Sequence, residues 1–282
     1  MTLTKQFFSL TKFILSTAVT LSALLSFFAY KGELNSTIIL PTIAIWLLAL
    51  GVSALNQVQE YKEDALMPRT KNRPIASGIM SVKTGLIISL SLILGALILG
   101  YLELGLFGLA IFVATVFIYN FAYTNLKKIS VYSAIYGALL GVIPPLVGWI
   151  VAGGQISDVR FLAIALLYFI WQIPHTWLLV LKFHKDYKSG GFNTVVDTFG
   201  IEPLKRITFI WILITMVIGL FVIYSFNITS IYLLVAVAFI HLYILFSSFK
   251  NLLKSDSYKR VFIEINIYIL YIMIILCLRF FI

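Results

Sequence analysis

The chain has 282 residues, of which 61% are hydrophobic and only 11% are charged, and its mean hydropathy is +1.02. Soluble globular domains contain about 45–50% apolar and about 25% charged residues, so this composition excludes a soluble globular protein. The net charge is +10, from 21 lysine and arginine residues against 11 aspartate and glutamate residues. The one cysteine, Cys277, excludes an internal disulfide and a zinc site built from cysteines.

Apolar runs of about 20 residues, the length of a helix that crosses a bilayer, recur along the whole chain. Backbone groups in lipid must be hydrogen-bonded within the protein, and runs of this length achieve that as helices. We therefore predict an all-α polytopic membrane protein, a single domain over residues 1–282 embedded in the lipid bilayer. In chain order, the nine predicted transmembrane helices are 7–30, 36–55, 82–101, 104–124, 130–152, 160–182, 207–226, 229–249 and 262–282.

The basic residues are distributed unevenly between the two sides of this topology. Eighteen of the 21 fall on the side of the N-terminus, and three, Lys31, Arg160 and Arg279, fall on the other. Because cytoplasmic loops carry an excess of lysine and arginine, this predicts a cytoplasmic N-terminus and an external C-terminus. The N-terminus lacks a cleavage pattern and a transit segment, which favours the cytoplasmic (inner) cell membrane. No polar segment interleaves aromatic and basic residues, so nucleic acid is not expected as a partner.

Two loops on the basic side, 56–80 and 182–206, are each about 25 residues long, and loops of this length tend to carry function. We expect the active site in these two loops, because they hold six of the eleven carboxylates in the chain. The six are Glu60, Glu63, Asp64, Asp186, Asp197 and Glu202.

The first of these loops begins with polar residues at regular spacing. Asn56, Glu60 and Asp64 stand at i, i+4 and i+8, so they share one face if the second span continues as a helix. Amide and carboxylate oxygens are ligands for Mg²⁺, which leaves other positions for phosphates. Arg69 and Arg73 follow, and their guanidinium groups suit phosphate oxygens. The pattern indicates a Mg²⁺–diphosphate site, although ordinary ion pairs on a helix surface produce the same spacing.

The loop sequence also resembles a known family. The pattern N-x3-E-x3-D-x2-MPRT-x2-RP, over residues 56–74, resembles the first aspartate-rich motif of the UbiA superfamily of intramembrane prenyltransferases. Its MPRT-x2-RP ending looks like the protoheme IX farnesyltransferase (heme O synthase) family. Three more strings, GVIPPLVGW at 141–149, WQIPHTW at 171–177 and KDYKSGG at 185–191, resemble that family in the same order. The resemblance covers essentially the whole chain, and the superfamily is known as nine-helix bundles with two polar motifs on the cytoplasmic side.

This resemblance implies an enzyme that transfers a farnesyl group from farnesyl diphosphate to a vinyl group of heme B, with Mg²⁺ as cofactor, to make heme O. The implied catalytic and metal-binding residues are Asn56, Glu60, Asp64 and Asp186. The implied diphosphate-binding residues are Arg69, Arg73, Lys127, Lys128, Lys182 and Lys185. The implied acceptor-binding residues are His175, Trp171 and Tyr187.

His175 has a second interpretation, because a lone histidine in an apolar helix is commonly a structural hydrogen-bonding residue. An ionisable side chain within a membrane span is nevertheless a functional candidate.

The sequence departs from the family pattern at three positions. Glu60 stands where the superfamily usually has aspartate, Lys62 stands where heme O synthases commonly have another aspartate, and Asp186 is the only carboxylate between Lys182 and Gly191. A UbiA-type prenyltransferase for a quinone precursor or another aromatic acceptor therefore remains an alternative. A secondary transporter is another, since polar residues in a bundle mark transport paths, but the chain lacks the internal repeat that transporters tend to show. The prenyl length and the oligomeric state are left open.

Overall fold

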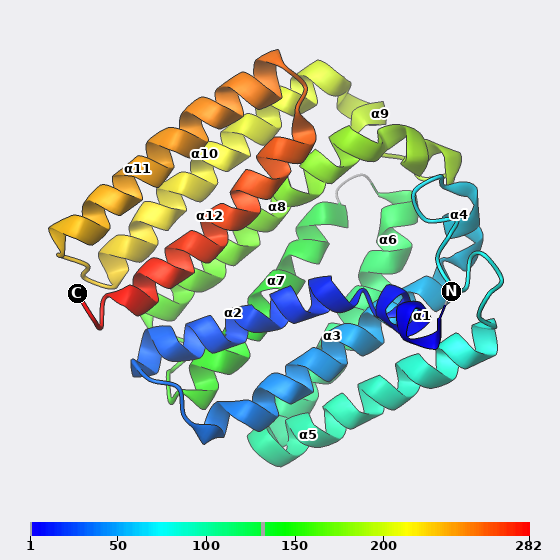
Figure 1. Cartoon of the computed structure of the whole chain (residues 1–282), viewed down its shortest axis with the longest axis horizontal. Helices are drawn as coiled ribbons and strands as arrows, with labels where there is room; N and C mark the ends of the chain where they lie inside the picture. The colour runs from blue at the N-terminus through cyan, green and yellow to red at the C-terminus, as the bar shows by residue number, and fades with distance from the viewer. Residues whose placement is uncertain (1, 131–132) are drawn as a thin grey trace.

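The computed structural model describes residues 2–130 and 133–282. In these residues the chain is helical with no strand, and the long helices lie side by side in one bundle (Figure 1). The helices are α1 (Leu3–Leu10), α2 (Phe13–Lys31), α3 (Ile39–Gln59), α4 (Tyr61–Leu66), α5 (Val82–Val116), α6 (Thr124–Ile129), α7 (Ser133–Val151), α8 (Val159–Ser189), α9 (Val195–Phe199), α10 (Ile201–Ser225), α11 (Ile231–Ser248) and α12 (Tyr258–Leu278). A 3₁₀ turn (Ser36–Ile38) precedes α3, and π-helical segments follow α5 (Phe117–Tyr123) and α11 (Phe249–Lys254).

Eight helices in the described chain are long and apolar enough to cross a membrane. One of them continues for 46 residues, from Val82 to Lys127, which is about 69 Å of helix and more than twice the ~30 Å of a hydrocarbon core. Gly105 breaks this segment with φ 60° and ψ −149°, a conformation that is essentially restricted to glycine. Beyond the break, Gly108 lies against the backbone of Gly100. The segment therefore folds back into two arms, which take the places of the third and fourth predicted spans.

Several predicted boundaries differ from those of the structure, and two of the differences concern the polar segments. The first span begins at Phe13, because residues 7–12 form the end of α1 and a break at Lys12, which adopts the left-handed conformation (φ 48°, ψ 46°). The predicted loop 182–206 is helical over its first residues, since α8 continues to Ser189. The loss of hydropathy shows where a helix leaves the lipid. The helix itself can continue beyond that point, because its backbone hydrogen bonds extend into the polar residues that follow.

The helices approach closely where small residues meet. α3 packs along α5, α8 along α10, and α2 along α7. In the last of these pairs, Gly148 of α7 contacts the backbone of Ala23 in α2 so closely that no Cβ would fit. Small residues allow such close packing of membrane helices, where lipid provides no hydrophobic drive for association. Close van der Waals packing between helices therefore stabilises the bundle in addition to apolar burial.

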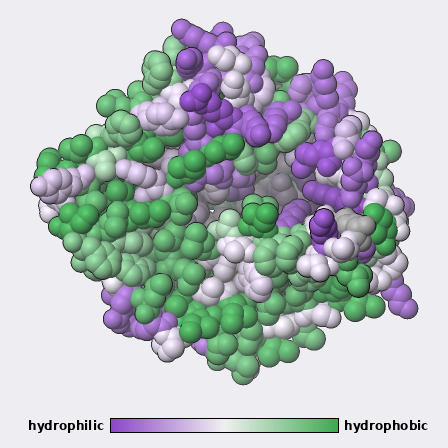
Figure 2. All heavy atoms as spheres, viewed as in Figure 1, coloured by the Kyte–Doolittle hydropathy of each residue, from purple (hydrophilic) through white to green (hydrophobic). Residues whose placement is uncertain are grey.

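The surface divides into apolar sides and hydrophilic ends. Figure 2 shows hydrophobic atoms over the left and lower sides of the bundle, while hydrophilic atoms gather at the top and right, over the region of α4 and α9 in Figure 1. The same view shows a hollow near the middle of this face. We call the end that holds α4, α6 and α9 the polar end.

Candidate functional site

The first polar motif lies where α3 ends. Glu60 breaks the helix with φ −114° and ψ 15° between α3 and α4, so the expected continuous helical face through Asn56, Glu60 and Asp64 is wrong. Backbone hydrogen bonds nevertheless bridge the break, from Glu60 N to Asn56 O (3.1 Å) and from Asp64 N to Glu60 O (2.8 Å). The three side chains are only 3%, 3% and 1% exposed. The three residues therefore still lie on successive turns despite the break, and all three side chains are buried.

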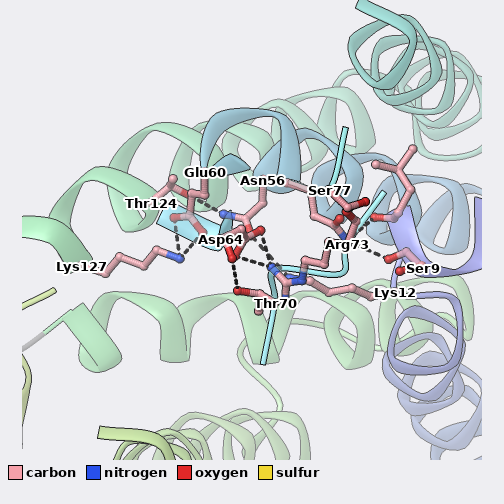
Figure 3. Close-up of polar contacts among 12 residues, drawn as sticks. Ser9, Lys12, Asn56, Glu60, Asp64, Thr70, Arg73, Ser77, Thr124 and Lys127 are labelled. Atoms are coloured by element: carbon pink, nitrogen blue, oxygen red, sulfur yellow. Dashed lines mark hydrogen bonds and ion pairs between the residues drawn. The ribbon is translucent and has the colours of Figure 1, made fainter. Parts of the chain in front are cut away.

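Each of the two buried carboxylates is held by one cation (Figure 3). The Arg73 Nη1 group donates to both oxygens of Asp64, at 2.9 and 2.7 Å. Lys127 Nζ lies 2.5 and 2.6 Å from the two oxygens of Glu60. Thr70 Oγ1 donates to the backbone oxygen of Asp64 at 2.9 Å and ties the following loop to α4. Each of the two carboxylates is therefore paired with a cation, and these two cations come from different segments.

Lys12 is a site residue that the sequence analysis did not single out. Its Nζ donates to Asn56 Oδ1 at 3.4 Å, while Asn56 Nδ2 donates to Thr124 Oγ1 at 3.2 Å (Figure 3). Burial, and secondarily the nearby Arg73 guanidinium, lowers the pKa of the Lys12 ammonium to about 8. A signal was present in the sequence, because Lys12 interrupts an apolar stretch, and ionisable residues there are functional candidates.

The end of α8 meets the first loop. Asp186 Oδ2 accepts a hydrogen bond from the Arg69 backbone N at 3.2 Å. The Arg69 guanidinium lies 5.0 Å from the Phe183 ring and 5.9 Å from the Tyr187 ring. Gly190 packs against Met67 so closely that a Cβ would lie 3.0 Å from its Cγ. Two segments more than a hundred residues apart in sequence therefore form one surface.

Aromatic rings also border the Lys127 ammonium. Its Nζ lies 5.7 Å from the Tyr123 ring and 5.6 Å from the Phe192 ring. Tyr119 stacks on Tyr123 with ring centroids 5.9 Å apart, and Tyr187 meets Phe192 edge-on at 6.1 Å. Aromatic faces attract cations, so the polar centre has walls that can stabilise positive charge. The arrangement combines buried carboxylates, cations suited to phosphate oxygens and an aromatic lining.

Comparison with known proteins places this site in a family. A family model described as the UbiA prenyltransferase family matches residues 16–270. The chain belongs to the UbiA prenyltransferase family. It is 30% identical over 183 residues to a protoheme IX farnesyltransferase from Oleidesulfovibrio alaskensis, with 65% of each chain covered. It is 28% identical over 250 residues to one from Trichodesmium erythraeum, with 88% of this chain and 76% of the relative covered.

The fold is that of solved UbiA structures. A UbiA homolog from Archaeoglobus fulgidus, bound to GPP and Mg²⁺, superposes with a TM-score of 0.70. The match covers 96% of this chain and 99% of the other at 15% sequence identity. The all-α fold class predicted from the sequence, a UbiA-type transmembrane bundle, is thus confirmed.

Not every residue suggested by the UbiA motifs lies at the centre of the site. Lys182 and Lys185 are exposed on α8, and Lys182 Nζ lies 4.6 Å from the Phe183 ring. Within the described chain, neither lysine forms an ion pair with Glu60 or Asp64. The Lys128 side chain lies outside the described residues.

The predicted acceptor residues separate into two places. Tyr187 lies beside Arg69 at the polar end, whereas Trp171 and His175 contact each other deeper in α8, with ring centroids 4.8 Å apart. His175 Nδ1 is hydrogen-bonded to Asn266 Oδ1 of α12 at 3.2 Å. This bond is the structural role expected of a histidine within an apolar helix, and it leaves Nε2 for another contact. Asp186 comes eleven residues after His175, and α8 bends between them at Phe183, so the two residues lie at most about 16 Å apart along the helix.

The donor set fits Mg²⁺ only together with a phosphate ligand. Among residues 2–130 and 133–282, no three histidine, cysteine, aspartate or glutamate side chains are grouped closely enough to hold a metal ion, so the predicted four-residue set does not form a closed cage. Mg²⁺, however, commonly takes one or two carboxylates plus substrate phosphates and waters. The buried oxygens of Asn56, Glu60 and Asp64 meet this requirement in chemistry and number.

Proposed function

We propose that the protein transfers a farnesyl group from farnesyl diphosphate to a vinyl group of heme B and so makes heme O. Relatives named protoheme IX farnesyltransferase support this proposal. The observation that carries it is the pair of buried ion pairs, Asp64 with Arg73 and Glu60 with Lys127, at the polar end of an apolar bundle. Both substrates combine a large apolar part with charged groups, the diphosphate in one and the propionates in the other, and so suit this division into lipid-like and polar regions.

Catalysis requires neutralisation of the leaving diphosphate. The carboxylates of Glu60 and Asp64, with the Asn56 amide, would hold Mg²⁺, which supplies positive charge to the diphosphate oxygens, and we propose that Asp186 contributes across the substrate from the end of α8. Arg73 and Lys127 pair with those carboxylates, and we propose that they turn to the phosphate oxygens as substrate binds. Fixed cations are most effective where negative charge develops in the transition state. A UbiA homolog of the same fold from Archaeoglobus fulgidus is solved with GPP and Mg²⁺ bound, which supports Mg²⁺ as the metal.

The remaining residues serve the prenyl carbon and the acceptor. When the allylic C–O bond breaks, its electron pair leaves with diphosphate, and positive charge develops on the farnesyl carbon. Tyr123, Phe192 and Tyr187, which surround the cations of the site, can stabilise that charge. The vinyl double bond then forms the new C–C bond, and water adds to the resulting cation with loss of a proton, which gives the hydroxyethylfarnesyl group. His175 and Trp171 would contact the porphyrin.

The proposal is tested by product analysis. Purified protein in lipid is incubated with heme B, farnesyl diphosphate and Mg²⁺, and the pigments are separated by chromatography and mass spectrometry. Heme O is the expected product, and omission of Mg²⁺ should abolish it. Absence of heme O with prenylation of a quinone precursor would overturn the acceptor assignment. Solute flux across vesicles without any prenylated product would favour a transporter instead.

The orientation of the bundle leads to a labelling prediction. We propose that the polar end faces the cytoplasm of the cell membrane, in line with the excess of basic residues there. In a Cys277→Ala background, the exposed residues Gln155 and Ser255 are replaced singly by cysteine. A membrane-impermeant maleimide should label the Gln155→Cys protein in intact cells and the Ser255→Cys protein only after lysis. The reverse pattern would invert the topology.

Lys12 leads to a prediction about pH. Lys12 lies beside Asn56 and close to Arg73, and we propose that its ammonium pairs with a phosphate oxygen of the bound diphosphate. Its pKa of about 8 means that it loses its proton, and with it the charge of this ion pair, as the pH rises through that value. The KM for farnesyl diphosphate should therefore rise above about pH 8, by roughly tenfold when one charged hydrogen bond is lost. Lys12→Arg should remove this rise, because arginine stays protonated. Steady-state kinetics across the pH range checks this, with the exposed Lys5→Ala as the control, and an unchanged rise in Lys12→Arg would contradict it.

A further inference from the structure

A groove between α11 and α12 has no role in the proposed reaction. It encloses about 560 Å³ and is lined by Tyr243 from α11, Ser257 at the start of α12, and Lys259, Arg260, Ile263, Glu264 and Ile267 from α12. In Figure 1 these helices form the side of the bundle opposite α1, α3 and α4. The groove is therefore separate from the polar site.

The chemistry of the groove changes along α12. Lys259 and Arg260 lie in its first turn, and both are exposed. Ile263 and Ile267 follow, and they are 45% and 52% exposed. Ser257 precedes the helix without a side-chain cap, so the helix dipole adds partial positive charge at this end. The groove is thus basic where α12 begins and apolar farther along the helix.

A buried carboxylate organises the basic end. Glu264 is only 6% exposed although it lies within a membrane span, and it accepts hydrogen bonds from three groups. Tyr243 OH donates at 2.9 Å, Ser247 Oγ at 2.6 Å and Arg260 Nε at 2.9 Å. These bonds satisfy a charge that is otherwise costly in lipid. They also fix the orientation of Arg260, whose side chain remains 60% exposed.

We propose that this groove binds one anionic phospholipid. The phosphate would accept hydrogen bonds from Arg260 and Lys259, and an acyl chain would lie along Ile263 and Ile267. Two cations against the single carboxylate of Glu264 leave the groove with a net positive charge, which favours an anionic headgroup over a zwitterionic one. Leu270 and Ile274, 39% and 40% exposed, continue the apolar face toward the other end of the membrane span. A lipid has this combination of charge and apolar length, whereas a free anion would use only the basic end.

The test measures lipid retention by the intact protein. Wild-type protein in nanodiscs of phosphatidylcholine, with and without phosphatidylglycerol, is transferred to detergent, and bound lipid is counted by native mass spectrometry. We expect one phosphatidylglycerol to be retained in preference to phosphatidylcholine. Lys259→Gln with Arg260→Gln should lower this preference roughly fivefold for each cation, and so roughly 25-fold in total. Lys5→Gln with Lys83→Gln removes the same charge at the same end of the bundle and should leave the preference unchanged.

Several outcomes would overturn the proposal. Equal retention of phosphatidylglycerol by the wild type and the Lys259→Gln, Arg260→Gln protein would show that the groove does not select the headgroup. Displacement of the lipid by inorganic phosphate would indicate a site for free anions. If the variant is poorly folded, Ile267→Trp provides a second measurement, because it fills the apolar part of the groove and should reduce retention while both cations remain.

Discussion

Asp64→Asn is expected to lower kcat/KM for farnesyl diphosphate by roughly 100- to 1000-fold, the loss typical for one preorganised electrostatic contact. The Asp64 carboxylate is 1% exposed and paired with Arg73, and the amide has nearly the same size but no charge for Mg²⁺. The variant therefore removes the charge and keeps the volume. Heme O formation under initial-rate conditions measures the effect.

A second ion pair provides the matched control for this substitution. Asp158 pairs with Arg160 at 2.6 Å beyond the opposite ends of the membrane spans, far from the polar end. Asp158→Asn makes the same chemical change to an aspartate–arginine pair and should leave kcat/KM unchanged. Wild-type activity in Asp64→Asn would refute the metal-binding role of this carboxylate. An equal loss in both variants would point to a general effect on folding.

Mg²⁺ and the prenyl diphosphate are expected to strengthen each other's binding by roughly 5- to 150-fold, the usual range of coupling between two ligands. Arg73 and Lys127 form ion pairs with the carboxylates that Mg²⁺ needs. With a diphosphate present, the two cations gain phosphate oxygens as new partners and release those carboxylates. Calorimetric titration of Mg²⁺, with and without an unreactive farnesyl thiodiphosphate, measures this coupling.

Arg73→Gln should affect the binding of the two ligands in opposite directions. The variant should bind the thiodiphosphate roughly 10- to 150-fold more weakly, because a charge-assisted hydrogen bond is lost. It should bind Mg²⁺ alone more tightly, because the buried Asp64 carboxylate then lacks its cation. Arg160→Gln is the matched control and should change neither affinity. Weaker binding of both ligands by Arg73→Gln would contradict the exchange of partners.

The amino-acid sequence was sufficient for the fold class because a membrane helix has a simple signature. Apolar runs of about 20 residues fix the number and order of crossings to a close approximation. The sequence analysis ends the third predicted span at 101 and begins the fourth at 104, so it places the reversal next to the break that the structure has at Gly105. The helical end of α8 was less accessible, because Lys182 to Ser189 are polar enough to resemble a loop, although α8 continues through them beyond a bend at Phe183.

The polar motifs of the site could be predicted from the sequence, but the ion pairs and hydrogen bonds between them could not. The spacing of Asn56, Glu60 and Asp64 marks a polar face, but the ion pair between Lys127 and Glu60 joins residues 67 positions apart. Such a contact depends on how α3 packs near the π-helical segment before α6. Lys12 reaches Asn56 only because the chain breaks between α1 and α2. The spacing of residues along one segment contains no information about such tertiary contacts between segments.

The length of α8 also sets how far apart the two predicted reactant contacts lie. His175 lies in the apolar part of this helix, and Asp186 lies at most about 16 Å farther along it, beyond the bend at Phe183 (φ −122°, ψ 22°) and at the polar end. A single aromatic ring covers only a fraction of that length. A tetrapyrrole with its substituents can extend from one point toward the other. If both residues contact the reactants, selection for a large acceptor follows from the rise of one helix, without a dedicated specificity loop.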